Sequence, residues 1–168
     1  MASLRITAGT LRGRRVAVPP NDVRPTSERA RQAYFNIVAD RIAGAHFLDL
    51  FAGSGVFALE AVSRGAASAT AVEQDKKYAA AIGRLAAEWS APVTVIAHDV
   101  FALRLDGEFD LVYADPPYDF GRYEELIAAI DAMPLAAGAL VAVEHRKGME
   151  IGGDSREYGD IAITFFER

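Results

Sequence analysis

The stretch FLDLFAGSGVFALEA, residues 47–61, carries three signals in close succession. An apolar run predicts a buried strand over 46–51, two glycines mark a tight turn, and a helical pattern follows over roughly 55–64. Gly53, Gly55 and Ala58 fit the pattern G-x-G-x-x-G/A, in which glycines let a ligand approach the backbone just before a helix begins. The stretch therefore predicts a ligand-binding loop of an α/β sheet, suited equally to a dinucleotide or to another adenosine-containing ligand.

The same alternation of strands and helices continues on both sides of this loop. Further strands are expected over 69–74, 93–98, 109–114, 139–145 and 160–166, and further helices over 27–40, 76–89 and 122–132. Crossovers of this length predict a Rossmann-like, mostly parallel, doubly wound sheet with helices on both faces. The last strand follows a segment rich in Gly, Asp and Ser without a helical pattern, so we expect it to be antiparallel.

The N-terminal segment stands apart from this plan. LRITAGTLRGRRVAVP, residues 4–19, alternates enough to form a small hairpin. We therefore divide the chain into a basic N-terminal arm, residues 1–22, and an α/β domain, residues 23–168.

Composition limits the possible chemistry. The chain has 168 residues, of which 51% are hydrophobic and 24% charged, as expected for one globular domain with a short appendage. It has no cysteine and three histidines, which excludes thiolate chemistry and leaves little for a zinc site, so we expect no metal. No apolar run approaches the roughly 20 residues that span a membrane, and no secretory signal is visible, so we expect a cytoplasmic protein without membrane association.

Charge is distributed unevenly along the chain. Residues 1–41 contain eight arginines and three acids, a balance of +5, whereas the remaining residues have a balance of −10. A basic arm before an acidic domain is typical of proteins that bind a phosphate backbone, although an ordinary solvated surface is the alternative. The candidate phosphate contacts are Arg5, Arg12, Arg14 and Arg15.

Three acids are expected at the same edge of the sheet as the glycine loop. Glu73 ends the second strand, where an acid can bind ribose hydroxyls. Asp99 follows the third strand and could accept a hydrogen bond from an adenine amine, or it could cap a helix. Asp115 follows the fourth strand. Ligands of such sheets bind beyond the carboxyl ends of the strands, so these acids predict one shared crevice.

The fourth strand ends in DPPY, residues 115–118. Pro116 and Pro117 stiffen the loop and leave carbonyl oxygens as acceptors, and Asp115 adds a carboxylate. Tyr118 offers a face on which a planar group can stack. Acceptors beside a stacking surface suit a planar group that carries an NH₂, whereas a plain turn is the alternative.

These motifs together resemble the class I S-adenosylmethionine-dependent amino-methyltransferases. Residues 4–19, RPTSERARQAYFNI (24–37), residues 47–75 and REYGDIAITFFER (156–168) resemble more narrowly the RsmD family, which methylates N2 of a guanine in small-subunit (16S) ribosomal RNA. The resemblance implies S-adenosylmethionine as cofactor, S-adenosylhomocysteine as product, and 16S rRNA within an assembled or partly assembled small ribosomal subunit as partner.

The resemblance also implies roles for individual residues. Asp115, Pro116, Pro117 and Tyr118 would hold the target base. The cofactor would be bound by Arg24, Thr26, Asp49, Gly53, Gly55, Glu73, Asp99 and Val100.

Three alternative functions would each explain part of these sequence features. A nucleotide-binding oxidoreductase would explain the glycines and Glu73 but would not explain the DPPY motif. A non-catalytic RNA-binding module would explain the arm but needs no cofactor groups. An amino-methyltransferase that acts on DNA adenine N6 or on a protein glutamine remains the closest alternative, although the arginine-rich arm favours nucleic acid.

Overall fold

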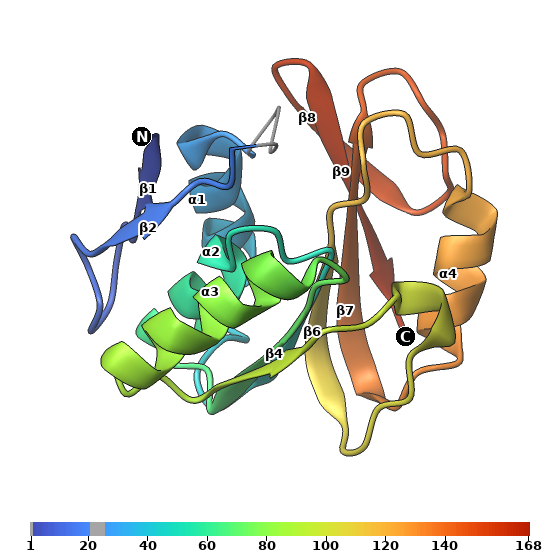
Figure 1. Cartoon of the computed structure of the whole chain (residues 1–168). Coiled ribbons are helices and arrows are strands. Elements are labelled where there is room, and N and C mark those ends of the chain that lie inside the picture. The colour runs from blue at the N-terminus through green and yellow to red at the C-terminus, as the bar shows by residue number, and fades with distance from the viewer. Residues whose placement is uncertain (1, 21–25) are drawn as a thin grey trace.

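The computed structural model describes residues 2–20 and 26–168, and within them a seven-stranded sheet forms the centre of the molecule (Figure 1). The strand order is β5-β4-β3-β6-β7-β9-β8. Neighbours from β5 to β7 are parallel, and β9 is antiparallel to both β7 and β8. The strands are β3 (His46–Leu50), β4 (Ser68–Val72), β5 (Val93–Ile96), β6 (Phe109–Ala114), β7 (Leu135–Arg146), β8 (Asp154–Tyr158) and β9 (Ile161–Glu167). This arrangement confirms the predicted fold class, including the antiparallel last strand.

Helices cover both faces of the sheet (Figure 1). On one face lie α1 (Glu28–Ile37), α2 (Val56–Ser63) and α3 (Lys76–Glu88); on the other lie α4 (Tyr123–Asp131) and the short 3₁₀ helix η1 (Val100–Ala102). Local signals fix where two of them begin: the Ser27 hydroxyl accepts from the Ala30 N–H at 3.1 Å, and Asp75 caps α3.

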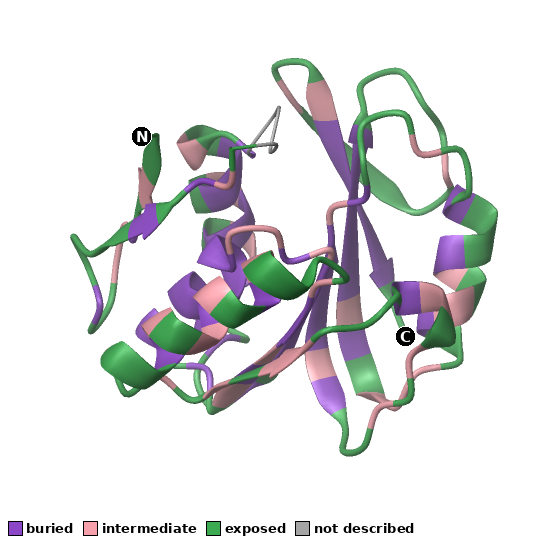
Figure 2. Ribbon diagram, in the orientation of Figure 1, coloured by how far each residue is buried: buried purple, intermediate pink, exposed green. Residues whose placement is uncertain are grey.

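The two faces of β3 show how its sequence divides the core. Phe47 packs into the cluster under α1, α2 and α3, whereas Leu48 and Leu50 pack into the cluster under α4. Alternate side chains of a strand point to opposite faces, so an apolar strand of this kind needs cover on both sides. Figure 2 shows the resulting band of buried residues through the central strands.

The N-terminal arm forms the predicted hairpin, with β1 (Ser3–Arg5) antiparallel to β2 (Arg15–Ala17). Its apolar side chains Ile6, Leu11 and Val16 are buried in the same cluster as Tyr34 and Phe35 of α1. The arm is therefore packed onto the helical face of the domain.

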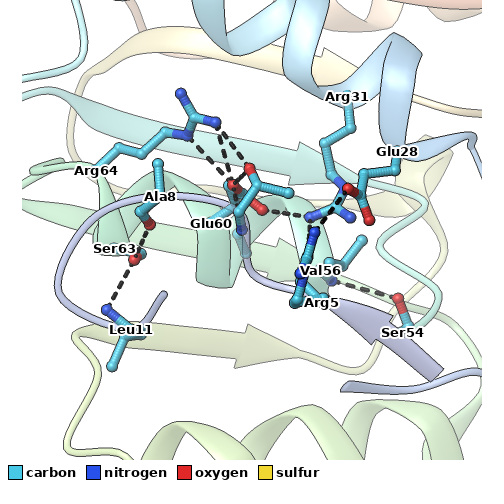
Figure 3. Close-up of polar contacts among 12 residues, drawn as sticks. Arg5, Ala8, Leu11, Glu28, Arg31, Ser54, Val56, Glu60, Ser63 and Arg64 are labelled. Atoms are coloured by element: carbon cyan, nitrogen blue, oxygen red, sulfur yellow. Dashed lines mark hydrogen bonds and ion pairs between the residues drawn. The ribbon is translucent and has the colours of Figure 1, made fainter. Parts of the chain in front are cut away.

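Polar contacts with α2 anchor the arm (Figure 3). Glu60 accepts from the Thr7 N–H at 3.0 Å and also pairs with Arg31 and Arg64. The Ser63 hydroxyl donates to the Ala8 carbonyl at 2.6 Å and accepts from the Leu11 N–H at 2.9 Å. Both anchors lie on α2, the helix that follows the glycine loop.

The structure differs from the sequence prediction between residues 135 and 158. β7 begins at Leu135 rather than near 139, and β8 forms a strand that the sequence analysis did not predict. The residues of β8, DSREY, are exposed except for the partly buried Tyr158, so they lack the apolar alternation that marks a strand. Pairing with β9 organises this edge strand.

Candidate functional site

The carboxyl ends of β3, β4, β6 and β7 surround a cavity of about 700 Å³. The strand order reverses between β3 and β6, so the cavity lies at the topological switch point of the sheet. Most of the predicted site residues line it: Thr26, Gly53, Glu73, Asp99, Val100, Asp115, Pro116, Pro117 and Tyr118. Arg24 lies outside the described residues. The cavity is thus the place where the predicted cofactor and base groups meet.

Gly53 and Glu73 are directly joined across the β3 and β4 ends. The Gly53 N–H donates to Glu73 Oε2 at 2.8 Å, and the Asp75 N–H donates to Glu73 Oε1 at 2.9 Å. Gly53 adopts a φ of +56°, in the left-handed region that favours glycine. Glu73 therefore holds the glycine loop in shape and also lines the cavity. The spacing of the two residues in the sequence does not by itself predict their hydrogen bond.

Gly55 and Asp49 lie behind the cavity rather than on its wall. Gly55 adopts a φ of +81°, and a Cβ there would stand 2.8 Å from the Ile82 side chain, so glycine is needed for close packing against α3. Asp49 is 2% exposed and accepts from the Ala58 N–H at 3.2 Å. Burial raises the pKa of Asp49 to about 8, with the hydrogen bond opposing and the charge of Glu73 adding to the effect. Both residues support the loop from beneath.

Asp99 caps η1 and also lines the cavity. Its Oδ1 accepts from the Phe101 N–H at 2.9 Å as the N-cap of η1, and its side chain also lines the cavity. Val100 follows as a buried apolar wall, 5% exposed. The cap fixes the carboxylate at the rim next to an apolar surface, an arrangement that suits an adenine ring and its amine.

Asp115, which is partly buried, belongs to a network of hydroxyl and carboxyl groups that reaches into the core. The Thr26 hydroxyl lies 3.0 Å from Asp115 Oδ2 and 2.7 Å from Glu144 Oε2, and the Tyr113 hydroxyl donates to the same Glu144 oxygen at 2.5 Å. Burial, followed by the nearby charges of Glu144 and Asp115, raises the pKa of Tyr113 well above its ordinary value. Tyr113 therefore acts as a hydrogen-bond donor in this network.

Tyr118 projects at the mouth of the cavity with 52% of its surface exposed. The Arg146 guanidinium lies 3.6 Å from the centre of its ring, and Arg146 Nε donates to the Tyr118 carbonyl at 3.1 Å. A cation over a tyrosine ring stabilises the ring's orientation. Arg146 thus holds Tyr118 next to the buried Pro116 and the exposed Pro117.

Two of these residues were missed by the sequence analysis. Glu144 and Arg146 end the apolar run of β7, and both line the cavity. The available signal was the acid in VAVEHR, a charged group at the carboxyl end of a parallel strand, where ligands bind.

The predicted RNA contacts lie on the outer side of the arm. Arg5, Arg12, Arg14 and Arg15 are all exposed, Arg5 lies 3.3 Å from Glu28, and Arg14 stands 5.4 Å from the Trp89 ring. Leu4 and Pro19 of the arm line the cavity, so this end of the arm adjoins it, whereas Arg14 lies at the C-terminal end of α3.

The charge balance of the first 41 residues overstates the positive charge of this surface, because Arg31 is wholly buried and paired with Glu60. An arginine count by itself could not distinguish a buried ion pair from a surface charge.

Over residues 2–20 and 26–168, no cluster of three or more His, Cys, Asp or Glu side chains is placed to hold a metal ion. No helix within the same residues has the length and apolar character needed to cross a membrane.

Comparison with known proteins gives consistent matches over the length of the chain. The family model described as Conserved hypothetical protein 95 matches residues 4–165. Ribosomal RNA small subunit methyltransferase D of Escherichia coli is 38% identical over 146 residues, covering 84% of this chain and 74% of that protein. The protein of the same name from Haemophilus influenzae is 32% identical over 153 residues, covering 86% of this chain and 79% of that protein.

Solved structures also match. A hypothetical protein of Thermus thermophilus superposes with a TM-score of 0.85 at 30% identity, covering 98% of this chain and 99% of that one. RsmC, a 16S rRNA N2 methyltransferase of the same organism solved with AdoMet and guanosine, has a TM-score of 0.78 at 18% identity and covers 99% of this chain and 50% of that one. At that identity the likeness to RsmC concerns the fold.

Proposed function

Because the chain belongs to the RsmD family, the ribosomal RNA small subunit methyltransferases D, we propose that it transfers a methyl group from S-adenosylmethionine to the exocyclic N2 amine of a guanine in 16S rRNA. The observation that carries this proposal is the single cavity that joins the glycine loop of β3 to the DPPY segment after β6. The relatives are named as rRNA enzymes, which favours rRNA over DNA adenine or a protein glutamine as the substrate.

The cofactor half of the cavity has groups that fit S-adenosylmethionine. Glu73 suits the ribose hydroxyls, Asp99 suits the adenine amine, and Val100 offers an apolar contact for the ring. Gly53, with no side chain, lets the cofactor approach the backbone. Asp49 and Gly55 hold the loop in shape. When bound, S-adenosylmethionine supplies a methyl group that the positive charge on sulfur already activates.

The acceptor half has groups that fit a base carrying an NH₂. The Asp115 carboxylate and the Pro116 carbonyl accept hydrogen bonds from the amine, which orients its lone pair towards the methyl group. Tyr118 stacks on the base and fixes its plane. As the nitrogen gains positive charge during an in-line displacement, Asp115 stabilises that charge and accepts the released proton. Alignment and electrostatic preorganisation thus account for the rate, without a covalent enzyme intermediate.

A guanine within a helix cannot enter this cavity, so the target must be unpaired or flipped out of its stack. Arg5, Arg12, Arg14 and Arg15 would contact phosphates and orient the RNA beside the cavity. We propose 16S rRNA in an assembled or partly assembled small subunit as the substrate and, on that basis, a cytoplasmic location.

The proposal is tested by incubating the purified protein with radiolabelled S-adenosylmethionine and either naked 16S rRNA or small subunits from cells that lack the protein. Mass spectrometry of the digested RNA should find the label in N2-methylguanosine, with more transfer to the subunits than to naked RNA. In parallel incubations with DNA or with protein, label in N6-methyldeoxyadenosine or in a glutamine side chain would instead support the alternative amine substrates.

A further inference from the structure

Glu144 is a second carboxylate in the acceptor half of the cavity, more deeply buried than Asp115, and the transfer described above does not use it. Its residue is 7% exposed, and it lines the cavity together with Asp115 and Pro116. Burying an acid costs free energy unless hydrogen bonds or charges compensate. A buried acid in a cleft, beside a first acid with a proposed role, is therefore a candidate for ligand recognition.

Two hydroxyl groups hold Glu144 in place. Tyr113 and Thr26 lie 2.5 and 2.7 Å from its Oε2, and they come from β6 and from the segment before α1. The side chain is thus fixed in orientation at the wall of the cavity.

Glu144 and Asp115 also face a common space. One hydroxyl, that of Thr26, lies within hydrogen-bond distance of both carboxylates. On the neighbouring elements, Tyr123 of α4 and Arg146 of β7 line the same part of the cavity. Burial, with the charges of Asp115 and Glu144 adding to it, raises the pKa of Tyr123 to about 12. The floor of the acceptor half therefore presents two adjacent acids.

Two adjacent acids match the donor pattern of one base. The Watson–Crick edge of guanine carries the N2 amine and, next to it, the N1–H, so two neighbouring groups donate. Adenine carries its amine beside an unprotonated ring nitrogen, whose lone pair a carboxylate repels. We infer that Glu144 accepts the N1–H of the flipped guanine while Asp115 holds the N2 amine, so that Glu144 selects guanine. This inference rests on the proposed function and assigns the base specificity of that site.

The inference is tested with two nucleosides that share the N2 amine but differ at N1. Guanosine has an N1–H, whereas 2-aminopurine riboside has an unprotonated N1. Binding of each to the protein saturated with S-adenosylhomocysteine is measured by ligand-detected NMR titration. The parent should bind guanosine at least about tenfold more tightly, because a site built for a donor rejects an analogue without it.

Glu144→Gln should reduce this preference to about twofold or reverse it, since the amide can donate to the bare N1. The matched control is Glu157→Gln on the exposed strand β8, where Glu157 pairs with Lys147 at 3.4 Å; it should keep the parental preference. 2-Aminopurine also lacks the guanine O6, but that difference is common to all variants, so the change in preference between variants isolates Glu144.

An unchanged preference in Glu144→Gln, with parental affinity for S-adenosylhomocysteine, would overturn the inference. Failure of the parent to bind guanosine would overturn it as well, because base recognition would then lie outside this cavity. Methyl transfer to rRNA by the same preparation separates these results from a failure of the proposed function: transfer to guanine with an unchanged preference removes the role of Glu144 and leaves the reaction standing.

Discussion

At the scale of single residues, the site depends on groups that differ in what they contact. Asp115 lies at the base of the acceptor half, hydrogen-bonded to Thr26, whereas Tyr118 lies at its mouth under Arg146. A group that acts on the developing charge of the amine contributes mainly in the transition state, and a stacking surface contributes to the bound base as well. Substitutions at the two positions should therefore give different kinetic signatures.

Asp115→Ala should lower the rate of single-turnover methyl transfer by at least about 100-fold, with nearly unchanged affinity for S-adenosylmethionine. The rate is measured with saturating cofactor over a range of small-subunit concentrations, and the affinity by calorimetry. Near-parental transfer would show that the acid serves only a structural turn.

Tyr118→Ala should weaken both the rate and the affinity for the RNA substrate, because a stacked base contributes on the order of 1–3 kcal/mol. Tyr118→Phe retains the ring and should keep most of the activity. Equal losses in the two variants, seen in the same assay, would instead implicate the hydroxyl.

Asp49 links a buried charge to the stability of the fold. Its pKa is about 8 in the folded protein against 3.8 ordinarily, so its contribution to stability is fully present below about pH 4 and is lost as the pH rises to about 8. Asp49→Asn keeps an acceptor for the Ala58 N–H and removes this titration. Between pH 5 and 7 the free energy of unfolding of the parent, relative to the variant, should fall by about 1 to 3 kcal/mol in denaturant titrations. A constant difference over that range would contradict the prediction.

At the scale of elements, the sequence predicts the buried parts of this fold better than its edges. The central strands have continuous apolar runs, which are typical of a sheet covered on both faces. The glycine loop is predictable because its glycines allow the tight turn between strand and helix. β8 was missed because a polar edge strand is specified by its partner β9 rather than by its own pattern. Glu144 was missed for a related reason: its role follows from Tyr113 and Thr26, which only the folded chain brings to it.

The arm as an element has two separable properties, its charge and its anchorage to α2. Replacing Arg12, Arg14 and Arg15 together by Ala removes exposed charge without touching the Ser63 anchor. RNA affinity should fall, and the slope of log affinity against log salt should become shallower by about 2 to 3, as expected when roughly three phosphate contacts are lost. Filter binding at several salt concentrations measures the slope, and affinity for S-adenosylmethionine serves as the control. Equal slopes in variant and parent would exclude the arm from phosphate binding.

At the scale of the whole molecule, the arm shares a core with the domain. Ile6 is fully buried in the cluster that also holds Tyr34 and Phe57, and Glu60 joins the arm to α1 and α2 through Thr7 and Arg31. We therefore predict that the arm, residues 1–22, and the α/β domain, residues 23–168, fold as one unit. If the two parts unfold as one unit, a cavity made in the arm must destabilise the entire sheet.

Ile6→Ala tests this coupling. Deleting a fully buried isoleucine side chain typically costs about 2–5 kcal/mol, and a cooperative molecule loses that amount from its global free energy of unfolding. Circular dichroism of the helices and sheet, and fluorescence of the single tryptophan, Trp89, should both report a midpoint lowered to the same denaturant concentration. The triple arginine variant, which leaves the buried contacts intact, should melt like the parent. If Ile6→Ala left the global transition in place and released only the arm, the hairpin would fold as an independent appendage. Its arginines would then reach RNA from a tethered segment rather than from a surface fixed on the α/β domain.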